Sequence, residues 1–365
     1  MTDFLQIQGV LRDGIPIEKG VVLTKQFLDD NQELFTKYLN LWILYPDLLL
    51  DVIQDSLDRQ NFHLMPFQRI ALRAVMRYRY HFWTATRATS KSFCVYLGGY
   101  LKCMLLPNSN VFIASDVKGT VIKTAESKFE EFFRHWPMLK NELMTKEDSG
   151  RAGEKKSNNY YELYFRNGSK LTVVSKDTSR GLRATAGILE EAATIEEEDY
   201  NEVLLPQLNV PRREVDGSLN PEEPVSTQTF ITTAREKTVF MYSKLIEITI
   251  NAVLNPKDYF SWGVSWEVPL HYGIINKQMI LDQRDSNTMS DEAFARESNS
   301  IWSGNNKDAW LDSKHLNKLR TLLKCERKAQ ENSPNSNTFY IIGVALSAPH
   351  FSNEMLKPLK LREAA

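Results

Sequence analysis

The chain has 365 residues, of which 42% are hydrophobic and 25% are charged, an ordinary balance for a globular protein. Its formal net charge of −1 disfavours a protein that coats DNA, although a local basic surface could still grip DNA transiently. The length allows two domains, or one large domain with an extension.

The first part of the chain is predicted to be helical. Apolar residues recur at helical spacing over 26–38 and over 41–53, with a break at Pro46. A further helix is expected to begin at Pro66, because proline is tolerated in a first helical turn. A short aromatic strand is expected near 79–85.

Beyond this strand, helical and strand patterns alternate. In chain order they predict a helix over 92–104, a strand over 110–115, a helix over 119–136, a hairpin of strands over 160–165 and 170–175, a strand over 187–189 and a strand over 227–233. The polar, glycine-containing stretch 145–158 is predicted to be a loop. Because strands alternate with helices, the sequence predicts an α/β fold with a mainly parallel sheet.

The C-terminal part has a different pattern. Past Tyr242 it predicts helices and irregular segments to about Arg327, and residues 331–337 have the composition of a linker. Residues 338–344 predict a strand for which the remaining sequence offers no partner. Neither a secretory signal nor the roughly 20 consecutive apolar residues of a membrane span is found. The three cysteines, Cys94, Cys103 and Cys325, lack paired spacing and are expected to be free thiols.

Residues 84–93, Thr-Ala-Thr-Arg-Ala-Thr-Ser-Lys-Ser-Phe, lie between a predicted strand and a predicted helix. The phosphate-loop pattern G-x-x-x-x-G-K-[ST] has small residues where the backbone wraps a phosphate, then a lysine and a hydroxyl. Here Ala85 and Ser90 take the two glycine positions, while Lys91 and Ser92 keep the end of the pattern.

A nucleotide site at this loop would use the free N–H groups and the positive end of the following helix. Lys91 would reach the β- and γ-phosphates, Ser92 would ligate magnesium, and Arg87 would touch the γ-phosphate. The expected nucleotide-contacting residues of the loop are Arg87, Ala88, Thr89, Ser90, Lys91 and Ser92. The alternative is a basic strand-to-helix turn with a chance Lys-Ser pair.

Two further strand ends carry candidate residues. Glu190 and Glu191 end an apolar strand; in ATPases with an additional strand, the first acid organises magnesium and the second polarises the attacking water. Glu190 stands where aspartate is usual, so it is expected to act through a water molecule. Thr232 and Thr233 end the next strand, where a γ-phosphate sensor would lie beside the acids. Solvated acids and a buried threonine-rich strand are the alternatives, but the order of the three segments predicts ATP hydrolysis with Mg²⁺.

With these segments in order, the chain resembles the large subunit of tailed-phage terminases, the motors that package DNA into procapsids. The resemblance implies a P-loop NTPase of the additional-strand type, with an N-terminal helical segment and a C-terminal helical extension. Met65 to Gln68 resembles the adenine-contacting segment, so Gln68 is expected to read the base. Residues 87–92 resemble the family's variant loop, and 294–297 with 301–302 resemble the end of the ATPase region.

The resemblance also implies roles and partners. Glu191, Arg87, Thr232 and Thr233 are expected to be catalytic, and Ser92 and Glu190 to hold the metal. The expected assembly is a ring at the portal of a procapsid, which translocates double-stranded viral DNA with a small subunit as partner. Free subunits are expected to be monomers in the cytoplasm of an infected bacterium, neither secreted nor bound to a membrane. An arginine finger would be Arg180, Arg183 or Arg235, which the sequence does not rank.

The C-terminus departs from the family. Members continue into an RNase H-like nuclease whose first strand ends in a metal-binding aspartate. Residues 338–344 resemble that strand, but Ala345 stands at the aspartate position. Because two-metal hydrolysis needs several carboxylates, nuclease activity is expected to be absent, through truncation, a frameshift or a genuinely short ATPase. The expected parts are a helical segment over 1–60, the ATPase core over 61–245, a helical extension over 246–330, and a linker with a nuclease remnant over 331–365.

Two other functions stay open. A P-loop helicase or remodeller would need a second motor domain, and no arginine-rich motif for one follows Ala234. A non-hydrolysing assembly protein is favoured by the missing glycines and by Glu190, and is opposed by the retained Lys91, Ser92 and Glu191.

Overall fold

The computed structural model describes residues 32–55, 62–115, 120–150, 152–175, 179, 181–285, 289–304, 338–341 and 359–362. The chain divides into two compact units, Met1–Ser303 and Gly304–Ala365. Among the described residues, no helix combines the length and the apolar character that crossing a membrane requires. The expected four-part division of the chain stays a prediction.

The first unit is built on an eight-stranded sheet with the order β3-β4-β5-β2-β6-β7-β1-β8. The strands are β1 Tyr80–Ala85, β2 Asn110–Ser115, β3 Glu154–Lys156, β4 Tyr160–Tyr164, β5 Lys170–Ser175, β6 Ala186–Glu190, β7 Thr227–Thr232 and β8 Tyr259–Val264. The strands from β5 to β8 in this order pair in parallel, and β4 joins β5 as an antiparallel hairpin. The predicted mainly parallel sheet is confirmed.

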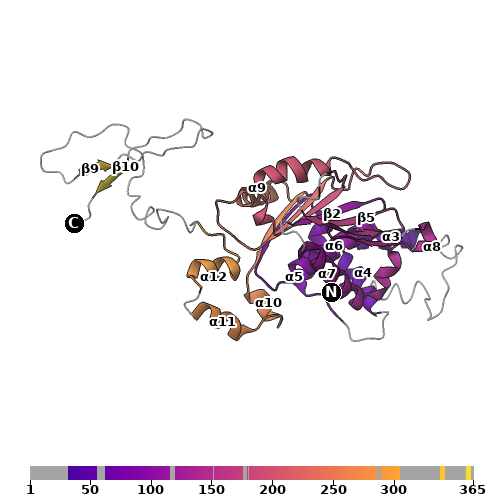
Figure 1. The fold of residues 1–365 in the computed structure, drawn as a ribbon, viewed down its shortest axis with the longest axis horizontal. Coiled ribbons are helices and arrows are strands. Elements are labelled where there is room, and N and C mark those ends of the chain that lie inside the picture. Colours follow the sequence, from indigo (N-terminus) through magenta and orange to yellow (C-terminus); the bar gives the residue numbers. More distant parts are fainter. Residues whose placement is uncertain are drawn as a thin grey trace. The chain divides into compact units, whose positions relative to one another are not determined.

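Helices cover both faces of this sheet. The α-helices are α3 Gln32–Leu44, α4 Pro46–Asp55, α5 Pro66–Arg77, α6 Lys91–Leu105, α7 Thr120–His135, α8 Lys146–Ser149, α9 Phe240–Leu254, α10 Glu267–His271, α11 Lys277–Asp285 and α12 Asp291–Glu297. In Figure 1, α5, α6 and α7 lie on one face and α9 on the other. Successive side chains of a strand point to opposite faces, so Trp83 packs with the α6 core while its neighbour Phe82 packs with the α9 core.

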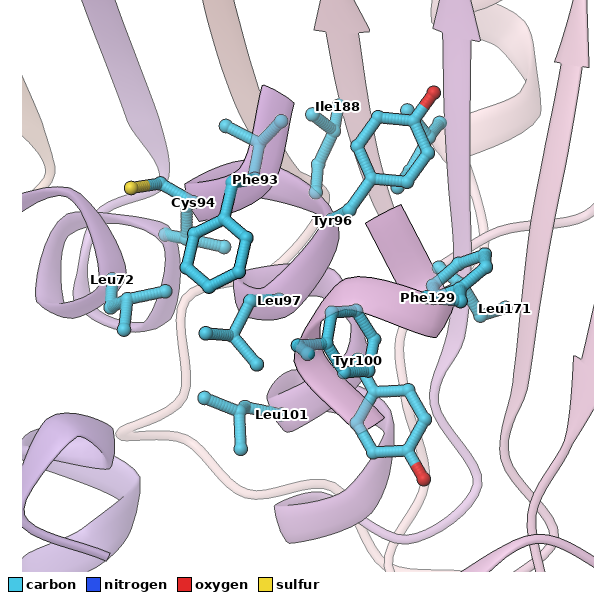
Figure 2. Close-up of a cluster of buried hydrophobic side chains, with 14 of the residues drawn as sticks. Leu72, Phe93, Cys94, Tyr96, Leu97, Tyr100, Leu101, Phe129, Leu171 and Ile188 are labelled. Atoms are coloured by element: carbon cyan, nitrogen blue, oxygen red, sulfur yellow. The ribbon is translucent and has the colours of Figure 1, made fainter. Parts of the chain in front are cut away.

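Helix α6 is enclosed on nearly all sides, as Figure 2 shows for its side chains Phe93 to Leu101. The glycine pair that weakens this helix locally allows its close packing. A Cβ at Gly98 would lie 3.2 Å from Val75 of α5, and one at Gly99 would lie 3.2 Å from Ile188 of β6. The helix that leaves the candidate loop is therefore fixed against both α5 and the sheet.

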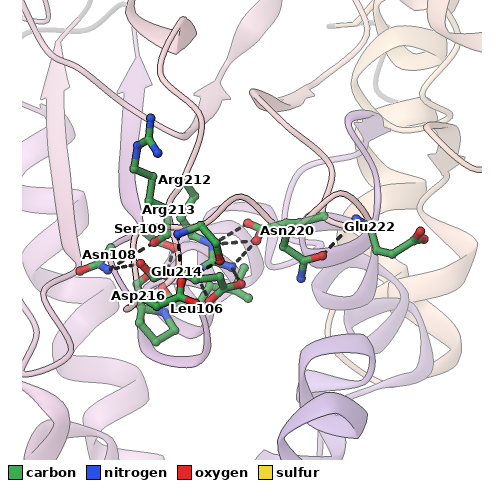
Figure 3. A network of polar contacts seen from close by, with 12 residues as sticks. Leu106, Asn108, Ser109, Arg212, Arg213, Glu214, Asp216, Asn220 and Glu222 are labelled. Atoms are coloured by element: carbon green, nitrogen blue, oxygen red, sulfur yellow. Dashed lines mark hydrogen bonds and ion pairs between the residues drawn. The ribbon is translucent and has the colours of Figure 1, made fainter.

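A polar network closes the amino edge of the sheet (Figure 3). The buried Arg212 donates to Glu223 at 2.7 and 2.8 Å, to Glu214, and to the carbonyl of Pro107 at 2.9 Å. These bonds satisfy a guanidinium that would otherwise be costly to bury. They hold the loop before β7 against the turn before β2, at the edge opposite the candidate site.

Three element predictions were wrong. The stretch 145–158 contains α8 and β3; the exposed residues of β3 pair with β4 through the backbone, which a polar composition does not reveal. Residues 259–264 were predicted to be irregular or helical, but they form β8. This edge strand pairs with β1, and Trp262 stacks on Trp83 at 4.8 Å between ring centroids. Its partner strand is far away in sequence, so no local pattern identifies it.

The third wrong prediction concerns the second unit. The strand predicted from 338–344 was expected to lack a partner, but β9, Thr338–Ile341, pairs antiparallel with β10, Leu359–Arg362. The partner was missed because a four-residue strand gives too short a pattern. Ala345 lies outside the described residues. Of the cysteines, Cys94 and Cys103 are buried free thiols, as predicted, and Cys325 also lies outside the described residues.

Candidate functional site

The three predicted motifs lie at the carboxyl ends of adjacent parallel strands. Strand β1 leads into the loop 86–90, β6 ends at Glu190, and β7 lies between them and ends at Thr232. Thr84 pairs with Thr232, and Glu190 pairs with Ile231. Because the carboxyl ends of parallel strands share one edge of a sheet, the structure brings the loop, the acids and the threonines together. This is the edge at which α/β proteins bind ligands.

The loop has the backbone of a glycine-rich turn without the glycines. Ala88 and Ser90 have φ angles of 61° and 57°, in the left-handed region that favours glycine. The hydroxyl of Thr89 donates to the carbonyl of Thr86 at 2.7 Å and braces the turn. Ser90 is the N-cap of α6 but makes no side-chain cap bond, so it leaves the N–H groups of the first turn for a ligand.

Lys91 is held by the loop itself. Its Nζ donates to the carbonyls of Ala85 and Thr86 at 2.9 and 3.0 Å. Burial lowers the pKa of Lys91, and the nearby charge of Glu191 partly offsets that effect. An ammonium has three donors, so two of them fix the side chain at the turn where a phosphate would bind.

Glu190 contacts the predicted metal ligand Ser92 directly. The Ser92 hydroxyl donates to one carboxylate oxygen, and the Tyr96 hydroxyl donates to the other at 3.1 Å. Burial raises the pKa of Glu190, and the two hydrogen bonds oppose this rise. The two predicted metal residues are therefore brought together. Tyr96 was missed by sequence reasoning, although it lies one helical turn after Ser92 on the same face of α6.

Glu191 differs from its neighbour. Its φ of 50° is left-handed, which turns the chain sharply at the end of β6. Its carbonyl accepts from the Thr194 hydroxyl at 2.8 Å, but within the described part of the chain its carboxylate has no hydrogen bond or ion pair. This half-buried carboxylate is available to a water molecule, as a general base must be.

Thr232 joins the acidic turn to β7. The Thr232 hydroxyl accepts from the Ala193 N–H at 3.3 Å and donates to the carbonyl of Thr233 at 2.9 Å. Both threonines are buried. A displacement of the turn after Glu191 would therefore be transmitted directly to β7.

A segment from the end of α12 crosses the same edge. The Glu297 carboxylate forms an ion pair with Arg87 at 2.7 Å, and its carbonyl accepts from the Thr86 hydroxyl at 2.8 Å. Farther along, the Trp302 indole donates to the Thr84 hydroxyl at 3.2 Å. The backbone N–H of Ser303 then donates to the carbonyl of Arg235 at 3.1 Å. The sequence analysis identified 294–297 and 301–302 as a motif but did not identify Glu297 as the partner of Arg87.

Other predicted residues lie elsewhere. Gln68 is buried at the start of α5, where its amide oxygen accepts from the Met65 N–H at 2.8 Å, and it makes no hydrogen bond to the loop among the described residues. Of the three candidate finger arginines, Arg180 lies outside the described residues. Arg183 is exposed at the amino end of β6, and Arg235 is exposed just beyond the carboxyl end of β7.

The oxygen donors at this edge suit Mg²⁺. Ser92 offers a hydroxyl and Glu190 a carboxylate, the hard ligands that magnesium prefers. In the described ranges, no group of three or more His, Cys, Asp or Glu residues gathers to hold a metal. Mg²⁺ usually keeps several waters and is bound by one or two protein carboxylates, so two oxygen ligands from the chain are compatible with it.

Comparison with known proteins gives a fold. No protein-family model matches the sequence, and no curated protein matches it. The large terminase of bacteriophage HK97 is similar in structure, with 14% identity and a TM-score of 0.50 over 67% of this chain and 52% of that one. The match thus spans about half of the HK97 protein.

Two other solved structures are similar at lower TM-scores. The large terminase ATPase domain of Thermus phage P74-26 is 13% identical over 78% of this chain and 100% of that one, with a TM-score of 0.46. The large terminase of a thermophilic bacteriophage, solved in complex with ATP-gamma-S, is 12% identical over 65% of this chain and 52% of that one, also at 0.46. Strand β7 lies between β1 and β6, and the HK97 likeness confirms the predicted α/β fold with a mainly parallel central sheet flanked by helices.

Proposed function

We propose that this chain is the ATP-hydrolysing motor subunit of a phage terminase. One observation carries the proposal: the loop with Lys91, the Ser92–Glu190 contact and the carboxylate of Glu191, which has no partner in the described part of the chain, converge at one sheet edge. A half-buried lysine, a hydroxyl and two acids in this arrangement are the groups that phosphoryl transfer needs. The fold shared with the HK97 large terminase supports the family.

The residues divide the work between binding and catalysis. The first-turn N–H groups of α6 and Lys91 bind the phosphates of ATP. Ser92 and Glu190 would hold Mg²⁺, which when bound would neutralise part of the charge that develops on the phosphate oxygens. Glu191 accepts a proton from the attacking water. Arg87 breaks its ion pair with Glu297 and then stabilises the γ-phosphate.

The remaining groups recognise the adenine, sense the γ-phosphate and line the phosphate site. Because the oxygen of Gln68 is engaged by Met65, its amide nitrogen is the group that would donate to the adenine. Thr232 and Thr233 sense the γ-phosphate through the acidic turn. Ala88, Thr89 and Ser90 form the phosphate-facing backbone.

The wider assembly is part of the same proposal. Double-stranded DNA, a portal with its procapsid, a small subunit and a ring of copies are the partners, in the cytoplasm of an infected bacterium. The exposed Arg235, at the same edge as the acids, supports a role across a ring interface. The expected absence of nuclease activity stays a prediction.

The test is Mg²⁺-dependent ATP hydrolysis by the purified chain. Lys91→Ala should abolish nucleotide binding, and Glu191→Gln should abolish hydrolysis while retaining binding. The exposed Glu196, five residues beyond Glu191, gives the matched control Glu196→Gln, which should hydrolyse ATP normally. Normal turnover in both Lys91→Ala and Glu191→Gln would contradict the site.

A non-hydrolysing assembly protein is the second candidate. The specific observation in its favour is that Lys91 already binds two carbonyls of its own loop. Undetectable turnover in the parent, not restored by procapsids or portal, would favour it. Turnover that requires DNA and procapsids would instead favour the motor.

A further inference from the structure

Helix α6 presents two hydroxyl groups to one carboxylate. Ser92 and Tyr96 are four residues apart, so they lie on the same face of the helix. Each donates to a different oxygen of Glu190, and the Tyr96 bond is 3.1 Å long. Both oxygens of the Glu190 carboxylate therefore accept hydrogen bonds from the same helix, α6.

The tyrosine is itself fixed. Its ring is fully buried and packs edge-to-face against Phe129 of α7, with 5.7 Å between the ring centroids. Figure 2 shows the hydroxyls of Tyr96 and Tyr100, one turn apart on α6, pointing in opposite directions. Tyr100 donates instead to the carbonyl of Leu139 at 2.6 Å. Only the first tyrosine of this pair faces the sheet edge with the acids.

The hydrogen bond from Tyr96 restricts a side chain that is longer than usual at this position. A glutamate has one more rotatable bond than the aspartate usual at this position, so its carboxylate has more positions to occupy. Ser92 alone constrains one oxygen and leaves the group free to pivot about that contact. Tyr96 constrains the other oxygen, and the plane of the carboxylate is then defined.

We propose that Tyr96 is a positioning residue that orients Glu190 toward Mg²⁺ in the nucleotide complex. The inference rests on the proposed function and deepens it. Residues that orient a metal ligand matter, since their loss typically lowers metal affinity by about 10- to 100-fold. Tyr96 acts through Glu190 and touches neither the nucleotide nor the metal.

The experiment compares ADP binding with and without the metal. Dissociation constants of a fluorescent ADP analogue are measured by equilibrium titration in Mg²⁺ and in EDTA, for the parent, Tyr96→Phe and Tyr100→Phe. Both variants lose one buried hydroxyl from the same helix, so general damage to the core affects them alike. Tyr96→Phe should weaken binding about tenfold in Mg²⁺ and leave it within about twofold in EDTA. Tyr100→Phe should change neither constant.

A second pair of variants tests the role through Glu190. In Glu190→Asp the shorter side chain cannot reach both hydroxyls, so adding Tyr96→Phe should change the Mg²⁺ constant little. The inference is overturned, and the proposed function is not, if a folded Tyr96→Phe keeps the parent's ratio of ADP dissociation constants in EDTA and in Mg²⁺. The same holds if Tyr100→Phe loses as much Mg²⁺-dependent ADP affinity as Tyr96→Phe. A parent that binds no ADP under either condition overturns the proposed function and the inference together.

Discussion

Arg87 and Glu297 form an ion pair of 2.7 Å between residues 210 positions apart in the sequence. It ties the loop after β1 to the end of α12, and the hydrogen bond from the Thr86 hydroxyl to the Glu297 carbonyl reinforces the link. The Arg87 side chain is 80% exposed, so water and salt compete with this pair. A phosphate could therefore draw Arg87 away at low cost.

The first prediction follows from that competition. Glu297→Gln keeps the shape of the side chain but removes its charge, so Arg87 becomes available to a γ-phosphate. A non-hydrolysable ATP analogue should bind about two- to fivefold more tightly, the range of an exposed ion pair. ADP lacks the γ-phosphate and should bind with an unchanged constant. Equilibrium titration of both nucleotides measures the difference.

The control for this prediction removes the arginine. In an Arg87→Ala background, adding Glu297→Gln should change neither binding constant. A gain of equal size for ATP and ADP, or one that survives Arg87→Ala, would show that Glu297 acts on the site by another route.

His81 predicts a loss of stability in mild acid. It is fully buried in β1, where its Nε2 accepts from the Trp262 indole at 2.9 Å, and burial lowers its pKa from 6.5 to about 3. Below pH 6.5 the imidazole of His81 binds a proton in the unfolded chain but stays neutral in the folded chain. Each pH unit between 6.5 and about 3 therefore costs about 1.4 kcal/mol of unfolding free energy, whereas above 6.5 the term is constant.

The comparison variant is His81→Gln, which keeps an acceptor for the indole but does not titrate. Urea unfolding at pH 7 and pH 5 should show the parent losing about 2 kcal/mol more than the variant over this interval. Other groups titrate alike in both proteins, so their contributions cancel. Equal losses would mean that His81 is not kept neutral by burial.

Lys102 predicts a pH dependence of the same sign in the alkaline range. Its Nζ is buried and donates to the Val75 carbonyl at 3.2 Å and to the Thr227 hydroxyl at 2.8 Å. Burial lowers its pKa from 10.5 to about 8, so between these values the folded chain releases a proton that the unfolded chain retains. Unfolding free energy should therefore rise with pH over this window, by about 3 kcal/mol in total.

Lys102→Met tests this dependence because methionine fills a similar volume without a charge. Near pH 7 the variant should be more stable by about 1 kcal/mol, since the cost of the buried charge exceeds that of the two lost hydrogen bonds. Above about pH 10 the order should reverse, because the parent gains stability that the variant cannot. The exposed control Lys140→Met should change stability by less than about 0.5 kcal/mol at either pH. A difference that does not vary with pH would contradict the assignment.

The central strands were predictable because burial on both faces leaves a continuous apolar run. Strand β2 has the bounds predicted from its sequence, Asn110 to Ser115. Strand β8 was not predictable in the same way, since Ser261 and Gly263 interrupt its aromatic residues. Its place in the sheet depends on pairing with β1, and that partner lies about 180 positions away in the sequence.

The residues of the candidate site likewise include some that the sequence could predict and some that it could not. Lys91, Ser92 and Glu190 could be predicted to meet, because the order of motifs determines which strand ends lie side by side. Tyr96 and Glu297 could not, because each matters through a distance across the fold. A tyrosine inside an apolar helix reads as core until the structure shows its hydroxyl on a carboxylate.

The last prediction links the packing of β6 to its acids. A Cβ at Gly187 would lie 2.7 Å from the ring of Phe112, which is buried beside it on β2, so Gly187→Ala should cost about 1–3 kcal/mol. The shift would also move Glu190, three residues along the same strand, and hydrolysis should fall. Gly263→Ala in β8 is the control, since its Cβ would meet only the Thr84 carbonyl at 3.7 Å, an ordinary contact. Thermal unfolding should show a lower Tm for the first variant alone, and equal Tm values would mean that Phe112 yields without strain.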